Sequence, residues 1–507
     1  MRTVSGRTDH VVVVGAGLGG LSTALRLAGA GRSVTVLERE TVPGGRSGLL
    51  EDGGYAFDTG PTVLTMPDLI ADALTSVGEE LSDWLTLDPV QPLYRAQFAD
   101  GTSLDVHSSV EAMAAEVASV CGGAAADGYR RFVSFVSRLY ELEMRDFIDR
   151  NIDSPFDLLR PSLARLAAIG AFRRLAPKVA SFLPDERLQR VFSFQAMYAG
   201  LSPYDALALY AVIGYMDSVA GVFFPRGGMH AVPRALAGAA EKHGVVLRYG
   251  ETVERVELSG ARAVAVHTTG GERIACDAVV LNPDLPVARR DLLGLRAPSL
   301  RKIKYSPSCF LLLAGSTAAY PETAHHTISF GHAWREVFDE ILGGRLMSDP
   351  SFLVTSPTRS DPSLAPAGRS SYYVLFPTPN LDAPIDWATT APYRDRVVET
   401  LESRGWPGFG DAIEVEHVTT PLDWAARGME RGTPFAAAHT FGQTGPFRPR
   451  NLWGDNVVFA GSGTHPGVGV PMVLLSGRLA AERILGPDPA YRSRAHRSRA
   501  QRARARR

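Results

Sequence analysis

The chain has 507 residues, 45% of them hydrophobic, and a formal net charge of −1, a size that allows roughly three packed domains. Its three cysteines (Cys121, Cys276 and Cys309) fit no metal-ligand spacing, and their odd number argues against a disulfide framework and favours a reducing compartment. No uninterrupted run of roughly 18 apolar residues occurs, because the nearest one, Ala206 to Met216, is interrupted by a charged residue. The sequence therefore excludes a membrane-spanning helix and allows only peripheral association with a membrane.

The N-terminal segment predicts a strand, a tight turn, a helix and a second strand. Val11 to Val14 is a β-branched run, and Val34 to Leu37 is another short apolar strand. Between them, the sequence GAGLGG places Gly15, Gly17 and Gly20 in the pattern G-x-G-x-x-G. The first glycine permits a tight turn, the second lets the backbone approach a pyrophosphate, and the third lets the helix pack closely on the strand. This context predicts a dinucleotide-binding unit.

The residues that follow favour FAD over NAD or NADP. Glu38 ends the second strand, where a carboxylate can accept the ribose hydroxyls and disfavours a 2′-phosphate. The sequence PGGR then ends at Arg46, and two further loops with little side-chain bulk occur at Phe57 to Thr62 and at Phe459 to Gly467. Such loops let backbone amides approach a large flat ligand along its length. The pattern therefore predicts a flavin dinucleotide.

The middle of the chain, from about Val110 to Tyr215, is predicted to be helical. Long periodic segments run from Tyr129 to Ile148 and from Leu158 to Phe182. The second is apolar at helical spacing with basic residues interleaved, and Pro177 is expected to kink it or split it in two. A basic amphipathic segment of this kind can lie in a bilayer interface. The same pattern also fits a surface helix of a globular domain.

The remaining elements predict an interleaved arrangement. A helix at Val232 to His243 is followed by short strands to about Asn282, and a last strand at Asn456 to Ala460 leads into a helix that ends at Leu485. The pieces of the nucleotide-binding sheet thus lie at the start, the middle and the end of the chain.

A basic tail follows this last helix. From Arg492 to Arg507 the chain carries eight arginines and no acid, and removing those eight charges from −1 leaves about −9 on the rest. Such a tail suits an anionic surface, and it equally suits a disordered, solubilising end.

Several longer stretches resemble bacterial phytoene desaturases, the carotenoid desaturase branch of the flavin amine oxidase superfamily. They are VFFPRGGMHAVPRAL (residues 222–236), AHHTISFG (324–331), DPSLAPAG (361–368), YYVLFPTPNL (372–381) and GSGTHPGVGVP (461–471). The resemblance covers about Asp9 to Leu485. The terminal motifs are shared with many flavoenzymes, whereas the middle ones are specific to the carotenoid branch.

This resemblance implies an α/β fold in which a Rossmann-like FAD-binding domain is interleaved with a mixed-sheet substrate domain and a helical, membrane-facing lid. The FAD-binding domain would comprise residues 8–66, 222–285 and 445–486, and the substrate domain residues 88–110 and 286–444. The lid would comprise residues 111–221, and residues 487–507 would form a basic, disordered tail.

By the same resemblance, the FAD would be bound by residues from all three segments of its domain. Glycines of the first motif would hold the pyrophosphate, Glu38 the adenosine ribose, Val253 the adenine region, and the last loop the ribityl chain and the isoalloxazine. The residues implied are Gly15, Gly17, Gly20, Glu38, Arg46, Gly60, Pro61, Thr62, Val253, Gly461, Val470, Pro471 and Met472.

Candidates for a catalytic base are His465, beside the flavin-side loop, and Asp157, with Asp217 as a third. Relatives carry an Arg-Asp pair near Asp157, but here the preceding residue is Phe156, which weakens any role for a charged pair. Each candidate also has a purely structural alternative, because His465 could brace a tight turn and Asp157 could cap a helix. The adjacent histidines at 325 and 326 should point to opposite faces of a strand, and we expect no metal.

The function implied is the FAD-dependent desaturation of phytoene, towards lycopene or a partly desaturated intermediate, with oxygen or a quinone as electron acceptor. We expect a cytoplasmic protein peripherally associated with the inner face of the cell membrane, and no nucleic acid partner. A polyene cis–trans isomerase and a non-catalytic prenyl-binding protein on the same scaffold are the alternatives. An amine oxidase would need an aromatic cage beside the flavin, which the sequence does not identify.

Overall fold

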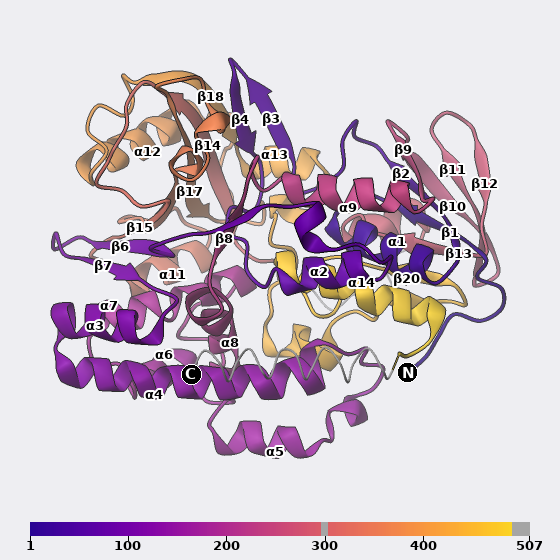
Figure 1. Ribbon diagram of the computed structural model, residues 1–507, viewed down its shortest axis with the longest axis horizontal. Coiled ribbons are helices and arrows are strands. Elements are labelled where there is room, and N and C mark those ends of the chain that lie inside the picture. Colours follow the sequence, from indigo (N-terminus) through magenta and orange to yellow (C-terminus); the bar gives the residue numbers. More distant parts are fainter. Residues whose placement is uncertain (296–302, 489–507) are drawn as a thin grey trace.

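A six-stranded sheet forms the core of the nucleotide-binding half in the computed structural model, which describes residues 1–295 and 303–488 (Figure 1). The strand order is β19-β20-β13-β1-β2-β9, parallel except for β19. The strands are β1 (His10–Val14), β2 (Ser33–Glu38), β9 (Val246–Tyr249), β13 (Ala278–Leu281), β19 (Leu452–Trp453) and β20 (Val457–Phe459). Because these strands come from the start, the middle and the end of the chain, the predicted interleaving is confirmed.

Helices cover this sheet closely. The central strand β1 has four buried valines, as a parallel strand covered on both faces requires. The helix α1 (Leu18–Gly29) follows it and packs against α14 (Val470–Leu485). A Cβ atom at Gly477 of α14 would lie 2.4 Å from the carbonyl oxygen of Gly19, so glycine is required for this approach. The helices α2 (Asp68–Thr75) and α9 (Ala231–Lys242) complete the layer (Figure 1).

A seven-stranded mixed sheet forms the second half, in the order β18-β14-β17-β16-β15-β6-β7, with only β15 and β6 parallel. Its long strand β14 is buried throughout and packs with Phe352 and Trp406 into an aromatic core. The helices α11 (Arg335–Leu342) and α12 (Ala391–Ser403) belong to this half. The strands are β6 (Tyr94–Phe98), β7 (Ser103–Val106), β14 (Ser308–Ser316), β15 (His326–Phe330), β16 (Phe352–Thr355), β17 (Ser370–Thr378) and β18 (Ile413–Thr419).

Smaller elements connect the two halves. The described residues also form a three-stranded sheet, the hairpin β3–β4 and the long-range pair β5–β8, together with the short helices α10 (Leu285–Val287) and α13 (Pro421–Ala426). The strands are β3 (Leu49–Asp52), β4 (Tyr55–Asp58), β5 (Leu87–Pro89), β8 (Phe223–Pro225), β10 (Val253–Ser259), β11 (Arg262–Thr268) and β12 (Arg273–Ala275).

The middle of the chain is helical, as expected. The long helix α4 (Gly123–Glu143) continues into a π-helical turn, η2 (Met144–Ile148), and α5 lies beyond α4 at the outer edge of the molecule (Figure 1). The other helices are α3 (Val110–Cys121), α5 (Pro161–Ala168), α6 (Leu175–Ala180), α7 (Glu186–Val191) and α8 (Ala211–Gly214). Within the described ranges, no helix is long and apolar enough to cross a membrane.

The amphipathic segment 158–182 is split in two, but not at the expected residue. The break lies between α5 and α6. It contains Gly170, whose φ of +83° suits glycine, and Arg174, whose backbone forms an isolated β-bridge with Leu207. Pro177 lies instead in the first turn of α6, where the missing N–H costs no helical hydrogen bond. The arginine tail lies outside the described residues.

Candidate functional site

The turn between β1 and α1 has the geometry that its glycines predict. Gly15 has a φ of +99° and donates its N–H to the carbonyl of Leu37 at 2.8 Å. A Cβ atom at Gly20 would lie 2.1 Å from the carbonyl oxygen of Gly15, so the helix could not pack this closely with any side chain there. Gly17 caps the N-terminus of α1. The helix dipole and free N–H groups at this end favour a pyrophosphate.

Glu38 lies at the end of β2 and is 6% exposed. Its carboxylate accepts the N–H of Ala16 at 2.6 Å and that of Glu40 at 3.0 Å, which fixes it beside the glycine turn. The carbonyl of Glu38 accepts the N–H of Glu251, and this bond brings Val253 at the start of β10 to the same end of the cavity. The structure thus places the predicted ribose and adenine contacts next to each other.

A large cavity, of about 1310 Å³, extends from this turn into the second half of the protein. Twelve of the thirteen residues implied for FAD line it, and Gly20 lies beneath it in the contact between α1 and β1. His465 and Asp217 also line the cavity. The sequence-predicted cofactor residues are therefore brought together from three distant segments.

Arg46 holds the loops at the flavin end together. Its guanidinium hydrogen-bonds Ser462 Oγ and lies 3.5 Å from Asp284 Oδ1, a buried oxygen for which no hydrogen bond is found. A Cβ atom at Gly60 would lie 1.8 Å from the carbonyl oxygen of Arg46, so the segment 60–62 can pass this loop only with glycine at its head. Thr62 accepts a hydrogen bond from Thr355 of the second sheet at 3.3 Å.

Two residues that the sequence did not suggest, Asn282 and Arg448, organise the cavity. Asn282 follows β13 and donates its amide to the carbonyl of Ala460 at 3.0 Å, and a Cβ atom at Gly17 would lie 2.5 Å from its Oδ1. Arg448 is buried and donates to the carbonyls of Ser462 at 2.6 Å and Thr464 at 3.0 Å. Burial lowers the pKa of Arg448 to about 10. Neither residue belongs to a local motif that the sequence displays.

His465 lies in the flavin-side loop as expected. Its Nε2–H donates to the carbonyl of Ile148 at 3.0 Å, which leaves Nδ1 as an acceptor, buried and without a hydrogen-bond partner. Burial lowers the pKa of His465 to about 4, so the imidazole is neutral at neutral pH. The buried His439 also lines the cavity, and its Nε2 likewise lacks a partner. The sequence did not single out His439.

Asp157 has a different environment from the one expected of a base. Its carboxylate accepts the N–H groups of Asp153 at 2.9 Å and Ser154 at 3.0 Å, forming a capping box at a short 3₁₀ helix. It is not among the described residues that line the cavity. The structure thus gives Asp157 the helix-capping role that was its alternative.

The histidine pair does not have the predicted arrangement. His325 lies just before β15, and its ring contacts that of His326 at a centroid distance of 4.4 Å, so the two do not point to opposite faces of a strand. Each binds a hydroxyl group, Ser360 at 2.7 Å and Thr355 at 2.8 Å respectively. Among the described residues, no group of three potential metal ligands is found.

Away from the nucleotide turn, the cavity is largely apolar. Its walls come from the helical region and from the second sheet, and they include Phe147, Phe194, Ile213, Ile328, Phe330 and Leu375. A ligand in this part of the cavity would contact few hydrogen-bonding groups. A flavin ring bound near Arg46 and Gly461 would close one end of this apolar part.

The glycine-lined cradle and the buried carboxylate fit a dinucleotide, and the sparse loops at Gly60 and Gly461 leave room for a flavin ring. The fold and the site thus define an FAD-dependent oxidoreductase. The family model described as flavin containing amine oxidoreductase matches residues 18–485, and the chain belongs to that family. When bound, FAD supplies the hydride acceptor, and the protein's residues bind and orient it.

Curated relatives match nearly the whole chain. A phytoene dehydrogenase of Streptomyces griseus is 58% identical over 494 residues, which are 96% of this chain and 97% of the relative. A zeta-carotene-forming phytoene desaturase of Myxococcus xanthus is 39% identical over 94% of both chains. Among solved structures, putrescine oxidase bound to putrescine has a TM-score of 0.60 at 14% identity and covers 94% of this chain and 99% of its own. That last likeness concerns the fold alone.

Proposed function

We propose that this protein is a carotenoid desaturase that introduces double bonds into phytoene, forming lycopene or a partly desaturated intermediate. The observation that carries the proposal is a continuous cavity that joins the dinucleotide cradle to a long apolar compartment. A hydrocarbon has no polar group that the protein could bind, so such a compartment must orient it by shape. The rate of desaturation then depends on placing an allylic C–H bond near the flavin. The 58% identity to a phytoene dehydrogenase over nearly the whole chain supports the same substrate class.

The deciding experiment is anaerobic reduction of the bound flavin by phytoene, combined with pigment extraction from cells that make phytoene. A desaturase bleaches the flavin absorbance and yields longer conjugated polyenes. An isomerase changes polyene geometry without net flavin reduction, and a non-catalytic prenyl-binding protein does neither. Reduction by putrescine but not by phytoene would point to an amine oxidase. Re-oxidation with oxygen or with a quinone identifies the acceptor, for which we propose one of these two.

We also propose peripheral binding to the inner face of the cell membrane through an apolar face formed by Phe156, Leu159, Phe172, Phe441 and Phe447. These side chains are exposed, Phe156 by 78% and Leu159 by 72%. A second, smaller cavity on this face shares Phe172 and Phe441 with the main cavity, which would let a hydrocarbon pass from lipid to the flavin site. Exposed basic residues nearby, Arg165, Arg173 and Arg174, suit anionic headgroups.

Liposome flotation tests this surface. The double variant Phe156→Ser, Leu159→Ser should bind anionic liposomes less tightly, whereas Leu422→Ser, which removes an exposed leucine from α13, should not. Removal of residues 489–507 and a salt series separate the contribution of the arginine tail. Unchanged flotation of the double variant would contradict the proposed surface.

A further inference from the structure

Two carboxyl groups interrupt the apolar part of the cavity. Glu143 is the last residue of α4, and Asp217 lies in η6 (Tyr215–Val219), a second π-helical turn, which follows α8. Both line the cavity, and they are only 6% and 5% exposed. Neither is needed to bind the dinucleotide at the glycine turn.

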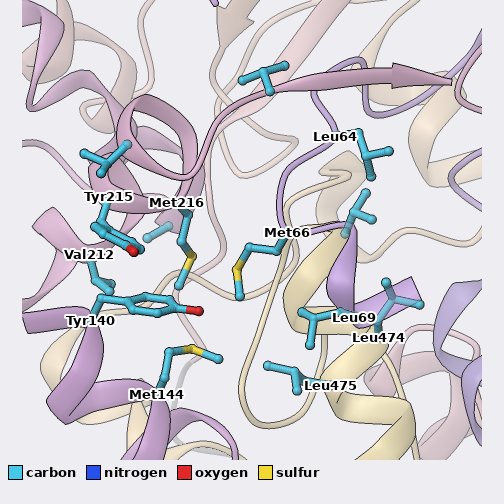
Figure 2. Close-up of a cluster of buried hydrophobic side chains, with 14 of the residues drawn as sticks. Leu64, Met66, Leu69, Tyr140, Met144, Val212, Tyr215, Met216, Leu474 and Leu475 are labelled. Carbon is cyan, nitrogen blue, oxygen red and sulfur yellow. The ribbon is translucent and has the colours of Figure 1, made fainter. Parts of the chain in front are cut away.

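Glu143 is located where α4 changes to a π-helical turn, and Asp217 lies within the π-helical turn that follows α8. Such turns are frequent at functional sites because they redirect side chains out of the regular helix. Tyr140 of α4 stacks on Tyr215 of η6 at a centroid distance of 4.3 Å, which packs the two segments against each other. Figure 2 shows Met144 and Met216 on one side of the apolar cluster, with Met66 facing them from the other side. The fold therefore fixes both carboxyls relative to the cavity.

The protein supplies little compensation for burying these groups. Glu143 Oε1 has no hydrogen-bond partner, and neither carboxyl forms an ion pair within residues 1–295 and 303–488. Asp217 accepts hydrogen bonds from Ser218 at 2.7 Å and from Gln195. An unpaired buried carboxyl is costly to a fold, so a purely structural role does not account for Glu143.

The titratable groups that face the two carboxyls are phenols. Tyr210 faces Glu143, and Tyr94 and Tyr198 face Asp217. Burial raises the pKa of all three phenols, so they are neutral at neutral pH. Burial also raises the pKa of Glu143 well above its usual range and that of Asp217 to about 7. A positive charge in the cavity would lower both pKa values again and favour the carboxylates.

We propose that Glu143 and Asp217 form a binding site for positive charge on an otherwise apolar, chain-like ligand. The inference rests on the proposed function, in which an allylic C–H bond gives its hydrogen and electron pair to the flavin and leaves a cation spread over the double bonds of the polyene. This cation is the only charged state of the hydrocarbon, so carboxylates that line its compartment would interact electrostatically with the cation. They stabilise the cation without gripping the neutral substrate, which favours the charged species over the ground state.

The test compares two ligands of similar length on the FAD-loaded protein, followed by the change each causes in the flavin absorbance spectrum. One is a polyprenyl tertiary amine that is protonated at neutral pH, and the other is the hydrocarbon squalene. Glu143→Gln and Asp217→Asn keep side-chain size and remove the ability to ionise. Glu141→Gln is the matched control, because Glu141 precedes Glu143 on α4 and pairs with Arg138 at 2.9 Å instead of lining the cavity.

We expect each cavity variant to lower the affinity for the amine at least about tenfold, and the affinity for squalene by no more than about twofold. In the unmodified protein, amine affinity should fall by up to about tenfold per pH unit as the pH drops below about 7, because binding then requires loss of the Asp217 proton. Equal losses for both ligands, or a flat pH profile together with unchanged amine affinity, would overturn the proposal. Failure of the unmodified protein to bind squalene would instead refute the polyene function and the inference with it.

Discussion

Arg478 of α14 forms a buried ion pair with Asp149, which follows the π-helical turn at the end of α4. Their side chains are 4% and 0% exposed, and Arg478 also bonds Glu482 at 2.8 Å. The helix α14 carries Val470, Pro471 and Met472 at its other end, against the cavity. This ion pair therefore connects the helical region to the helix that borders the flavin site.

Replacing Arg478 by Met should destabilise the protein by about 3–5 kcal/mol, because two buried carboxylates, Asp149 and Glu482, would lose their ion pair with this guanidinium. Equilibrium unfolding in urea measures the change. The control is Arg138→Met, whose pair with Glu141 is at the surface and should cost no more than about 1 kcal/mol. Similar small losses for both variants would show that the buried pair does not stabilise the fold.

Gly20→Ala should abolish or strongly weaken FAD binding. The added methyl group would lie 2.1 Å from the carbonyl oxygen of Gly15, so α1 must move away from the turn that faces the pyrophosphate. Gly123→Ala is the matched control, because its methyl group would enter open space at the start of α4. Flavin content per purified chain, read from absorbance, distinguishes the two. Full flavin content in Gly20→Ala would contradict the close-packing role.

Glu38→Ala should lower FAD affinity by about 10- to 100-fold, the equivalent of roughly 1.5–3 kcal/mol for a hydrogen bond to a charged group. The loss arises because the carboxylate fixes the glycine turn through Ala16 as well as facing the ribose. Titration of the apoprotein with FAD, followed by flavin fluorescence, gives the affinity. Glu254→Ala, an exposed position on β10, should leave it unchanged.

His465→Ala separates a base from a structural histidine. If Nδ1 accepts the substrate proton, turnover should fall by about 10²–10⁴-fold with FAD still bound. If the ring only braces its loop against Ile148, turnover should change little. Because the pKa of His465 is about 4, its titration should not limit turnover between pH 6 and 8 in either case. Rapid-reaction measurement of flavin reduction in the variant decides between the roles.

The nucleotide-binding unit could be predicted because its determinants are local: the glycine spacing, two apolar strands and an acid at the end of the second. The residues that organise the rest could not. Asn282 and Arg448 act by reaching backbone carbonyls of the loop 460–464, which lie far away in the sequence. Glu143 ends a helix rich in charged residues, and nothing local distinguishes a cavity-facing acid there from a solvated one.

In the lid segment, too, a distant contact that the sequence does not show determines the structure, here the position of a helix start. Pro177 indicated a break, yet proline in a first helical turn loses no hydrogen bond, so its position relative to the helix start decides its effect. That start is set by the bridge from Arg174 to Leu207, a tertiary contact. Periodicity correctly predicted helix over this region but could not locate where two helices meet.

The stability of the protein should depend on pH through the buried Asp217. The pKa of Asp217 is raised to about 7 in the folded protein from 3.8, so between these values the folded state holds a proton that the unfolded state has released. Stability associated with this group is thus present at low pH and lost as the pH rises to about 7. Asp217→Asn, which cannot ionise, should be more stable than the unmodified protein at pH 8, by up to about 4 kcal/mol. The difference should shrink by about 1.4 kcal/mol for each pH unit below 7.

Urea unfolding at pH 5, 6, 7 and 8 measures the trend, with the exposed Asp205→Asn as a variant that should show none. A constant difference across this range would mean that Asp217 is ionised throughout in the folded protein.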